Sequence, residues 1–344
     1  MRPTLPSGNP LPPGCTLKDG RYYAVIKNKW HGLSRAEDGD VEFWLCYYRL
    51  TKADPHTIAA ILIAFLDEGM GELAEETRAQ YKVSIVTRLI PACGHFHRRD
   101  FNRSHVAQYL EARKKARAPV GGNRERAALS SACEFAMRKG WLKENPARGV
   151  RRNRERPSRV YVQHPQLTAA IDKASFALAN LLAVAYLWGA RQTDLRLLKW
   201  DQLPAADSKD PYVHIDESKT YKPRDHEITA TVRIFLERAA EHRETVAARY
   251  EAAAKKLEAN SQFRRAADRR TRGATVRAQP FVFLTMRGLP WSKWGLQSAM
   301  RRLEVDFAFR QLRPKAETDK PGTLGHKGQM QRVYLRREKL RAVK

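Results

Sequence analysis

The second half of the chain carries a set of side chains suited to chemistry at a phosphate group. Two arginines stand far apart in sequence, and a lysine, a third arginine, a histidine and a tyrosine accompany them. These candidate catalytic residues are Arg191, Lys219, Arg310, Arg313, His326 and Tyr334. No phosphate-binding loop of the GxxxxGK[ST] type, dinucleotide GxGxxG motif, HExxH motif or GxSxG motif occurs in the chain.

These residue types predict cleavage and rejoining of a phosphodiester without a metal. A phosphodiester under attack gathers negative charge on its two non-bridging oxygens. Arginine binds such oxygens with a planar fork that stays charged at any working pH. A lysine held near the phosphate can give a proton to the leaving oxygen. A tyrosine nucleophile keeps the energy of the phosphoryl bond, so the ends can be rejoined without ATP.

Metal chemistry is the competing interpretation. Asp194, Asp201 and Asp216 are able to hold Mg²⁺ in a nuclease, but no paired carboxylates share an obvious face and basic residues surround them. Cys93-Gly-His95-Phe-His97 offers three zinc ligands where zinc usually takes four, so an ordinary loop is favoured there. We therefore expect no metal and no cofactor.

Each main candidate also has an ordinary structural interpretation. Arg191 follows an apolar helix and is able to act as a partner of the helix dipole. Lys219 is one of three nearby cations, with Lys222 and Arg224, and Tyr334 is able to pack on a basic tail.

The order of five segments resembles the tyrosine recombinases, especially phage and genomic-island integrases. The segments are Leu187-Trp-Gly-Ala-Arg191-Gln-Thr-Asp194, Glu217-Ser-Lys219-Thr-Tyr-Lys-Pro-Arg224, Phe309-Arg310-Gln-Leu-Arg313, Leu324-Gly-His326 and Arg332-Val-Tyr334-Leu-Arg-Arg337. Upstream, the stretch from Asn123 to Pro146 is similar to the last helix of the family's helical core-binding domain. The resemblance covers most of the chain after the first ~50 residues.

The resemblance implies a role for each residue. Arg191, positioned by Asp194, and Arg313 would bind the scissile phosphate. Lys219 would protonate the leaving 5′-hydroxyl, and His326 would hydrogen-bond the phosphate or assist the nucleophile. Tyr334 would attack and form a 3′-phosphotyrosyl link.

It also implies partners. The expected partner is double-stranded DNA, bound by a homotetramer on paired sites, with the tail Leu335–Lys344 docking on a neighbouring subunit. Accessory DNA-bending proteins are a further expected partner, whereas a membrane is not.

Three departures from the family pattern leave alternatives open. Arg310 stands where many members have histidine, so its role becomes electrostatic. The stretch from Arg313 to His326 is short, with Glu317–Gly322 permitting little more than a turn, and the spacing from His326 to Tyr334 is one residue below the commonest. The alternatives are a catalytically weakened DNA-binding relative and an enzyme like a type IB topoisomerase.

Composition agrees with a nucleic-acid partner. The 344 residues carry 64 Lys+Arg against 37 Asp+Glu, a formal net charge of +27, and compacting so much like charge favours a polyanionic partner. The apolar runs Ile58–Leu66 and Leu178–Trp188 fall short of the ~20 residues that span a membrane. The N-terminus lacks the apolar segment of a secretory signal. Four widely spaced cysteines indicate reduced thiols, so we expect a cytoplasmic, bacterial, nucleoid-associated protein.

The sequence patterns of the elements that position these residues predict a mainly α protein with a small β component (α+β). We expect an N-terminal extension over 1–54, a helical core-binding domain of SAM-like type over 55–150, a basic linker over 151–159 and a mixed α/β catalytic domain over 160–344. A hairpin over Gly20–Leu33, with Arg21, Lys27, Lys29 and Trp30 exposed, suits either a DNA groove or a solvated sheet edge.

Periodicity predicts the remaining elements. The first lobe should contain helices at Ile58–Leu66, Thr77–Ile90, Ser104–Ala118 (N-cap Ser104) and Asn123–Lys139, with Gly121-Gly122 as a break. The second should contain two buried helices in Gln166–Ala190, strands at Tyr212–Ile215 and His226–Ala230, a helix at Thr231–Arg249, a charged helical stretch Glu251–Arg272 projecting from the core, a buried strand or short piece at Phe281–Leu284 and a helix at Trp291–Val305.

Overall fold

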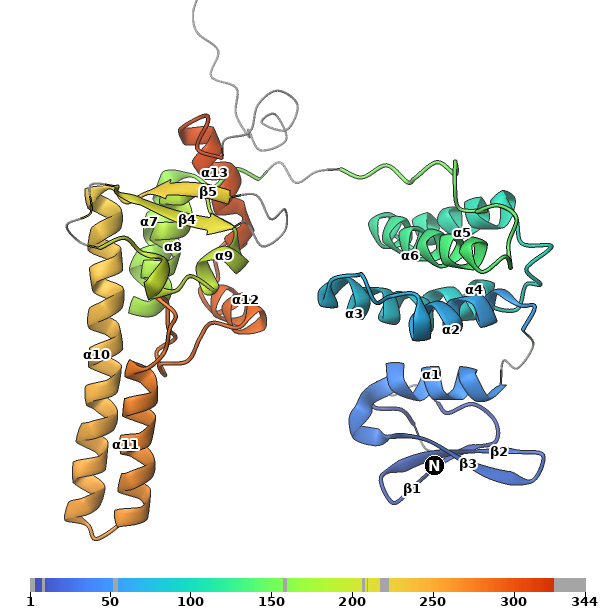
Figure 1. The fold of residues 1–344 in the computed structure, drawn as a ribbon, viewed down its shortest axis with the longest axis horizontal. Helices are drawn as coiled ribbons and strands as arrows, with labels where there is room; N and C mark the ends of the chain where they lie inside the picture. The colour runs from blue at the N-terminus through green and yellow to red at the C-terminus, as the bar shows by residue number, and fades with distance from the viewer. Residues whose placement is uncertain are drawn as a thin grey trace, which may run out of the picture. The chain divides into compact units, whose positions relative to one another are not determined.

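The computed structural model describes residues 4–7, 10–51, 55–156, 160–205, 208, 210–216 and 223–324. The chain is mainly helical with two small antiparallel sheets, as the sequence predicts (Figure 1). It forms two compact units, Met1–Pro157 and Ser158–Lys344. Each unit has hydrophobic clusters of its own. No helix of the described part is long and apolar enough to cross a membrane.

The first unit begins with a three-stranded antiparallel sheet in the order β1-β2-β3, which contains the predicted hairpin. Its strands are β1 (Cys15–Lys18), β2 (Arg21–Ile26) and β3 (Lys29–Arg35). Lys27 and Asn28 form the β2-β3 turn with positive φ angles of 49° and 60°, as the tightest hairpin turns require.

Helix α1 (Gly39–Thr51) was not predicted and packs on two neighbours. Phe43 faces the sheet, where its ring meets Tyr22 edge-on at a centroid distance of 5.0 Å. Leu45 and Tyr48 are buried with the helices that follow. The helix thus joins the sheet to the helical bundle, and its two apolar faces explain why no single amphipathic stripe marks it in the sequence.

The bundle contains the helices predicted between 55 and 150. They are α2 (Ile58–Glu68), α3 (Glu75–Ser84), the π-helical turn η2 (Ile85–Leu89), α4 (Ile90–Cys93), α5 (Arg103–Lys115) and α6 (Pro119–Arg138). The predicted helix Thr77–Ile90 is therefore α3, η2 and the start of α4.

Two details of this bundle correct the predictions. Asn102, not Ser104, caps α5, because its side chain accepts a hydrogen bond from the Ser104 backbone N–H at 2.9 Å. Gly121 and Gly122 do not break the chain but lie inside α6. A Cβ at Gly122 would lie 2.8 Å from the Cβ of Arg113, so this glycine allows α5 and α6 to approach closely.

The first part of the predicted basic linker, residues 151–156, is hydrogen-bonded to the helical bundle. The Asn123 side chain accepts from the Asn153 backbone N–H and donates to the Asn153 carbonyl, both at 2.8 Å. The Asn153 side chain in turn donates to the Leu110 carbonyl at 3.0 Å. Residues 151–156 therefore follow a fixed path on α5 and α6, with the side chains of Arg151, Arg152 and Arg154 exposed.

The second unit is built around the buried helix α8 (Phe176–Trp188), which packs with α7 (His164–Lys173) as predicted. Its other elements are α9 (Gln192–Arg196), η3 (Trp200–Gln202), β4 (Tyr212–Asp216), β5 (Pro223–Glu227), α10 (Ala230–Ala259), α11 (Phe263–Arg277), α12 (Lys293–Arg302), η4 (Phe309–Gln311) and α13 (Leu312–Asp319).

Several bounds in this unit differ from the predictions. Strand β5 ends before the predicted His226–Ala230 strand does, because Thr229 caps α10 by accepting from the Val232 backbone N–H. Phe281–Leu284 forms isolated bridges rather than a strand, with Val282, Phe283 and Leu284 buried, which agrees with the alternative prediction of a short piece ahead of the next helix. Helix α13 continues to Asp319, so Glu317, Thr318 and Asp319 are helical where little more than a turn was predicted for Glu317–Gly322.

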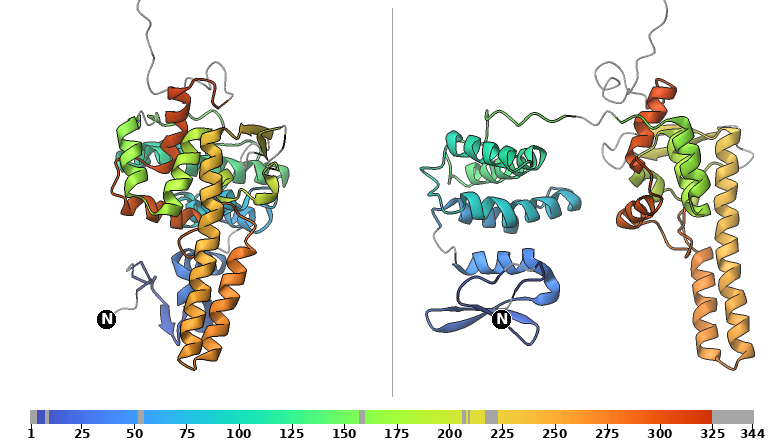
Figure 2. Two further views of the ribbon diagram at one scale, coloured as in Figure 1. Left: turned by 90° about the vertical axis from the view of Figure 1, so that its left-hand side faces the viewer. Right: turned by 180° about the vertical axis from the view of Figure 1, so that it is seen from behind.

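Helix α10 runs without interruption across the boundary predicted between Thr231–Arg249 and Glu251–Arg272, and it ends inside the second of these stretches, at Ala259. It pairs with α11 in a long hairpin, and Figure 2 shows its distal half projecting from the rest of the second unit, as the sequence predicts.

Candidate functional site

Arg191 lies at a sharp turn between α8 and α9. Helix α8 ends at Gly189, whose φ of +58° is left-handed, and Arg191 is the residue that precedes the first turn of α9. A Cβ at Gly189 would lie 2.7 Å from the Leu324 side chain, so both the backbone angle and the packing require glycine. Asp194, expected to position Arg191, is buried within α9.

Arg313 reaches this same turn from the other end of the unit. It lies in the first turn of α13 and is only 8% exposed. Its Nη1 donates a hydrogen bond to the Gly189 carbonyl at 2.9 Å. The structure therefore brings together the two arginine segments that the sequence keeps more than a hundred residues apart.

Arg310 belongs to the same neighbourhood. It is exposed on η4 and lines a cavity of about 520 Å³ together with Gln192, the residue that follows Arg191. Arg196 holds α9 to this region, because its Nη1 donates to the Trp291 carbonyl at 2.7 Å just ahead of α12. An exposed guanidinium beside the Arg191 turn is suited to the electrostatic role predicted for Arg310.

The backbone of Leu324 is held from two sides. The buried carboxylate of Glu317 accepts from the Leu324 N–H at 2.8 Å and from the Gly322 N–H at 2.9 Å. The Leu324 carbonyl accepts from Nη1 of Arg224 on β5. We call Glu317, Leu324 and Arg224 the Leu324 clamp. It fixes β5 to the turn after α13, two residues before the predicted His326.

Lys219, His326 and Tyr334 lie outside the described residues, so their roles stay predictions. The described residues next to these segments are Asp216 and Pro223, on either side of Lys219, and Leu324, ahead of His326. Asp216 at the end of β4 pairs with Pro223 at the start of β5, and Lys219 stands between these two residues in the sequence. Leu324, the last described residue, packs against Gly189.

A buried charge network anchors α13. Lys315 is 1% exposed, lies 5.1 Å from each of the Tyr161 and Tyr186 ring centroids and pairs with Asp319 at 2.8 Å. Asp319 also accepts from the hydroxyls of Tyr161 at 2.6 Å and Tyr186 at 2.9 Å. Burial alone would raise the pKa of Asp319, but the hydrogen bonds from Lys315 and the two tyrosines outweigh it and the pKa is lowered.

Sequence reasoning missed this network and the Leu324 clamp. Arg224 was noted only as a cation near Lys219, and nothing in the sequence singles out Glu317 or Asp319. Asp319 stands four residues after Lys315, a spacing that in isolation indicates only a solvated helix face. Glu317 stands two residues after Lys315, a spacing that does not bring side chains together on a helix.

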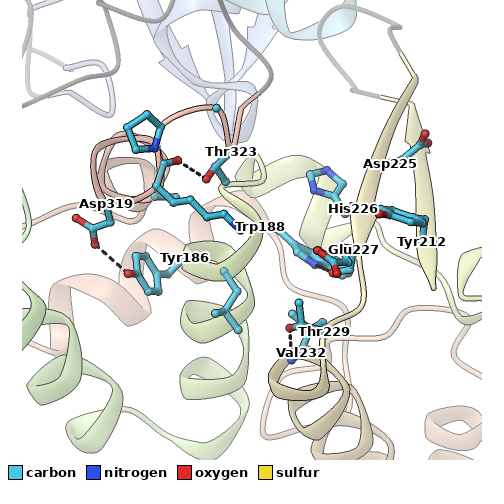
Figure 3. Close-up of a pocket in the computed structure, with 15 residues that line it drawn as sticks. Tyr186, Trp188, Tyr212, Asp225, His226, Glu227, Thr229, Val232, Asp319 and Thr323 are labelled. Carbon is cyan, nitrogen blue, oxygen red and sulfur yellow. Dashed lines mark hydrogen bonds between the residues drawn. The ribbon is translucent and has the colours of Figure 1, made fainter.

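A cavity of about 580 Å³ lies between the end of α8, the β4-β5 pair and the turn after α13 (Figure 3). Trp188, Tyr186, His226 and Asp319 line it, whereas Arg191, Arg310 and Arg313 do not. Trp188 ties two of its walls together, because its Nε1 donates to the Glu227 carbonyl at 2.8 Å. This cavity therefore adjoins the arginine turn without containing it.

Metal ligands do not gather in the described part of the chain, where no group of three or more His, Cys, Asp or Glu side chains is placed to hold an ion. Cys93 is buried, which raises the pKa of its thiol to about 11 and disfavours a metal-binding thiolate. Cys93 is the last residue of α4, and a turn follows it towards His97.

No protein-family model matches the sequence, and no curated protein matches it either. Solved structures do match its fold. A lambda integrase dimer bound to a COC′ core site is similar with a TM-score of 0.62 at 16% identity, covering 97% of this chain and 98% of that chain. A lambda integrase tetramer bound to a Holliday junction gives 0.62 at 14% identity over 97% and 98%.

The integrase of the Tn1549 transposon, in complex with circular intermediate DNA, is similar with a TM-score of 0.56 at 13% identity, covering 81% of this chain and 95% of that chain. The chain therefore has the fold of these integrases, which confirms the fold that the sequence resemblance implies.

Proposed function

We propose that this protein is a site-specific tyrosine recombinase of the integrase type, which cuts and rejoins duplex DNA through a covalent bond to Tyr334 and thereby integrates or excises a mobile element. The observation that carries the proposal is the hydrogen bond from Arg313 to the Gly189 carbonyl. On an integrase fold, this bond gathers the two predicted phosphate-binding arginines at one helix end.

The proposed reaction exchanges one phosphoester bond for another. Arg191 and Arg313 bind the non-bridging oxygens of the scissile phosphate and stabilise the charge that develops there, and the exposed Arg310 adds a third cation. The Tyr334 oxygen attacks phosphorus and forms the 3′-phosphotyrosyl bond as the bond to the 5′-oxygen breaks.

Protons move at two places in this step. Lys219 gives a proton to the departing 5′-oxygen, and His326 hydrogen-bonds the phosphate or assists the tyrosine hydroxyl. Attack of a 5′-hydroxyl from another strand on the phosphotyrosine reverses the chemistry and joins the new ends, so neither ATP nor a metal is required.

The Leu324 clamp supports this assignment. Because Arg224 on β5 and Glu317 on α13 both hold Leu324, the strands that frame Lys219 and the turn that leads to His326 are attached to one backbone unit.

Partners follow from the same proposal. The solved integrases include a dimer on a core site and a tetramer on a Holliday junction, and we infer a homotetramer on paired DNA sites for this chain. The tail Leu335–Lys344 would dock on a neighbouring subunit, accessory proteins would bend the DNA, and the protein would act at the nucleoid of a bacterial cytoplasm.

The first unit would also contact the DNA. Its β2-β3 turn presents Lys27, Lys29 and Trp30, which is 61% exposed, so the sheet is suited to a groove of the duplex. The helical core-binding domain and the basic segment 151–156 would follow the phosphate backbone.

Trapping on nicked DNA tests the chemistry. Nicked duplexes of randomised sequence release the broken strand, so a cleaving enzyme accumulates as a covalent complex that denaturing gels resolve. The wild-type protein should form this complex in the presence of EDTA, and Tyr334→Phe should not. Trapping that persists in Tyr334→Phe would refute the nucleophile assignment.

The same assay separates the alternatives. A weakened relative would shift the DNA in a native gel without a covalent complex, which the short stretch from Arg313 to His326 would explain. An enzyme like a type IB topoisomerase would form the complex and also relax a supercoiled plasmid that has no paired site.

A further inference from the structure

The α10-α11 hairpin projects beyond the part of the second unit that holds the candidate site (Figures 1 and 2). Small buried residues form the seam between its helices, including Ala247, Ala254, Ala266 and Gly273. A Cβ at Gly273 would lie 3.2 Å from the Ala247 carbonyl oxygen, so the backbones approach closely. The long side chains are consequently displaced to the two flanks and the outer faces of the hairpin.

One flank is neutralised by ion pairs. Glu244, Glu251 and Glu258 recur every seven residues on α10, so they line one side of that helix. Arg270 donates to Glu258 at 2.7 Å, and Arg277 donates to Glu244 at 2.9 Å and also pairs with Glu251. The hydrogen bond from Arg277 lowers the pKa of the Glu251 carboxyl, which agrees with a formed pair.

The other flank lacks such acids. Arg265, Arg269 and Arg272 stand at positions i, i+4 and i+7 of α11, so they form one row, which we call the arginine stripe. On α10, the seven-residue row on the side of the stripe runs through Arg243, Tyr250 and Leu257, none of which is acidic.

The contacts of the arginine stripe are all within the hairpin. Arg265 donates to the Gln262 side chain at 3.0 Å, and Arg272 pairs with Asp268 of its own helix at 3.1 Å. Arg269 lies over the Tyr250 ring at 6.0 Å. Across these fully described helices, no acidic side chain of α10 pairs with the stripe, whose two outer arginines are exposed.

We propose that the arginine stripe is a second DNA-binding site, which takes the phosphate backbone of duplex DNA apart from the scissile phosphate. Seven residues of α-helix span about 10 Å, and a duplex presents one charge per about 1.7 Å of its axis, so the stripe meets several phosphates. Arginine forks bind phosphate in paired hydrogen bonds. The inference takes its partner, DNA, from the proposed function.

Charge favours DNA over a protein partner. A protein interface needs an apolar centre, and the large exposed apolar side chain of the distal hairpin is Phe263 at the tip, away from the middle of the stripe. A row of guanidinium groups beside a half-buried tyrosine is instead suited to a smooth polyanion.

The hairpin provides its own matched control. Arg265→Gln/Arg272→Gln and Arg270→Gln/Arg277→Gln remove the same charge, at the same seven-residue spacing, from opposite flanks of one helix. The measurement is the slope of log Kobs against log salt concentration for a fluorescent duplex, with helicity checked by circular dichroism.

The stripe variant should lose about two phosphate contacts, which lowers the magnitude of the slope by about 1.8. The control variant should keep the wild-type slope. Equal losses in both variants, or no loss in the stripe variant, would overturn the proposal. So would an unchanged DNA slope with reduced self-association in sedimentation, because the stripe would then meet a second copy of the chain.

Covalent trapping keeps this test apart from that of the proposed function. The stripe variant should still form the Tyr334 complex on a short nicked duplex. A wild-type protein that never forms the complex, combined with the expected change of slope, would remove the recombinase proposal and leave the stripe as a DNA contact.

Discussion

Arg313 is nearly buried, whereas Arg310, three residues before it, is exposed. A buried guanidinium is costly unless it is hydrogen-bonded, and the bond to the Gly189 carbonyl meets part of that requirement. The side chain is therefore held in place by the fold, as electrostatic catalysis at the proposed site would require.

Arg313→Lys should slow covalent-complex formation by roughly 10²- to 10³-fold, because lysine keeps the charge but loses the planar fork. The rate is measured in single-turnover trapping on nicked DNA. The exposed Arg301, changed to Lys in the same way, is the control and should change the rate little. Equal rates for Arg313→Lys and the wild type would remove Arg313 from phosphate binding.

Lys219→Ala should slow cleavage strongly on an ordinary phosphodiester but much less on a substrate with a 5′-thiolate leaving group. The thiolate leaves without protonation, so a proton donor is no longer needed. Comparing the two cleavage rates checks this prediction. A loss of the same size on both substrates would exclude the proton-donor role.

The sequence predicted some residues of the candidate site and not others. Arg191, Arg310 and Arg313 were found because each stands in a short motif, and the structure brings their segments to one helix end. Glu317 and Asp319 were not found, because a buried carboxylate is recognised by the N–H and O–H groups around it, and those come from distant elements.

At the scale of helices and strands, features set by the local sequence were predicted, and features set by packing between distant segments were not. Most helices were predicted from the periodicity of apolar residues, but Gly121-Gly122 was wrongly predicted to break the chain. Glycine has two uses, a turn and a close approach of two backbones, and only the packing of α5 against α6 distinguishes them. Helix α1 was missed because both of its faces are apolar.

The two glycines should therefore respond in opposite ways to alanine. At Gly122 a methyl group would lie 2.8 Å from the Arg113 Cβ, so Gly122→Ala should lower the free energy of unfolding by about 1–3 kcal/mol. At Gly121 the nearest atom is the flexible end of Arg113 at 3.2 Å, and Gly121→Ala should raise stability by about 0.5–1 kcal/mol. Urea unfolding measures both, and similar effects at the two positions would contradict the packing argument.

His242 predicts a pH dependence for the packing of α10. It is buried, with a ring nitrogen 3.2 Å from the Thr285 carbonyl, and burial lowers its pKa below the ordinary value of 6.5. A lowered folded-state pKa gives stability that is present above pH 6.5 and lost as the pH falls through the folded pKa.

The second unit should accordingly be less stable at pH 5 than at pH 7, and His242→Gln should reduce that difference because glutamine does not titrate. Urea unfolding of wild type and variant at the two pH values provides the comparison. An identical pH dependence in both proteins would show that His242 is not the responsible group.

At the scale of the whole molecule, the chain consists of two units that each bury a core of their own. We expect chains 1–156 and 160–344, produced separately, to unfold cooperatively in calorimetry. A mixture of the two should bind DNA more weakly than the intact chain, because the tether makes the second binding event intramolecular. An equimolar mixture with full affinity would show that the tether contributes nothing.

The fold of most of the chain after the first ~50 residues was predicted through the family resemblance, and the similarity to solved integrases confirms it. Net charge indicated DNA but could not distinguish one basic surface from another. The two flanks of the α10-α11 hairpin have similar numbers of arginines, and only the register of the glutamates across the seam separates them.

Helix α1 has a practical consequence for shortening the protein. It covers the sheet with Phe43 and the bundle with Leu45 and Tyr48, so a chain that starts at residue 55 would leave the partners of those side chains facing water. Such a truncated protein should expose apolar surface and be prone to aggregate. A protein that retains α1 but lacks the sheet would instead expose the face of α1 that carries Phe43. Helix α1 therefore covers apolar residues of the helical bundle as well as those of the sheet.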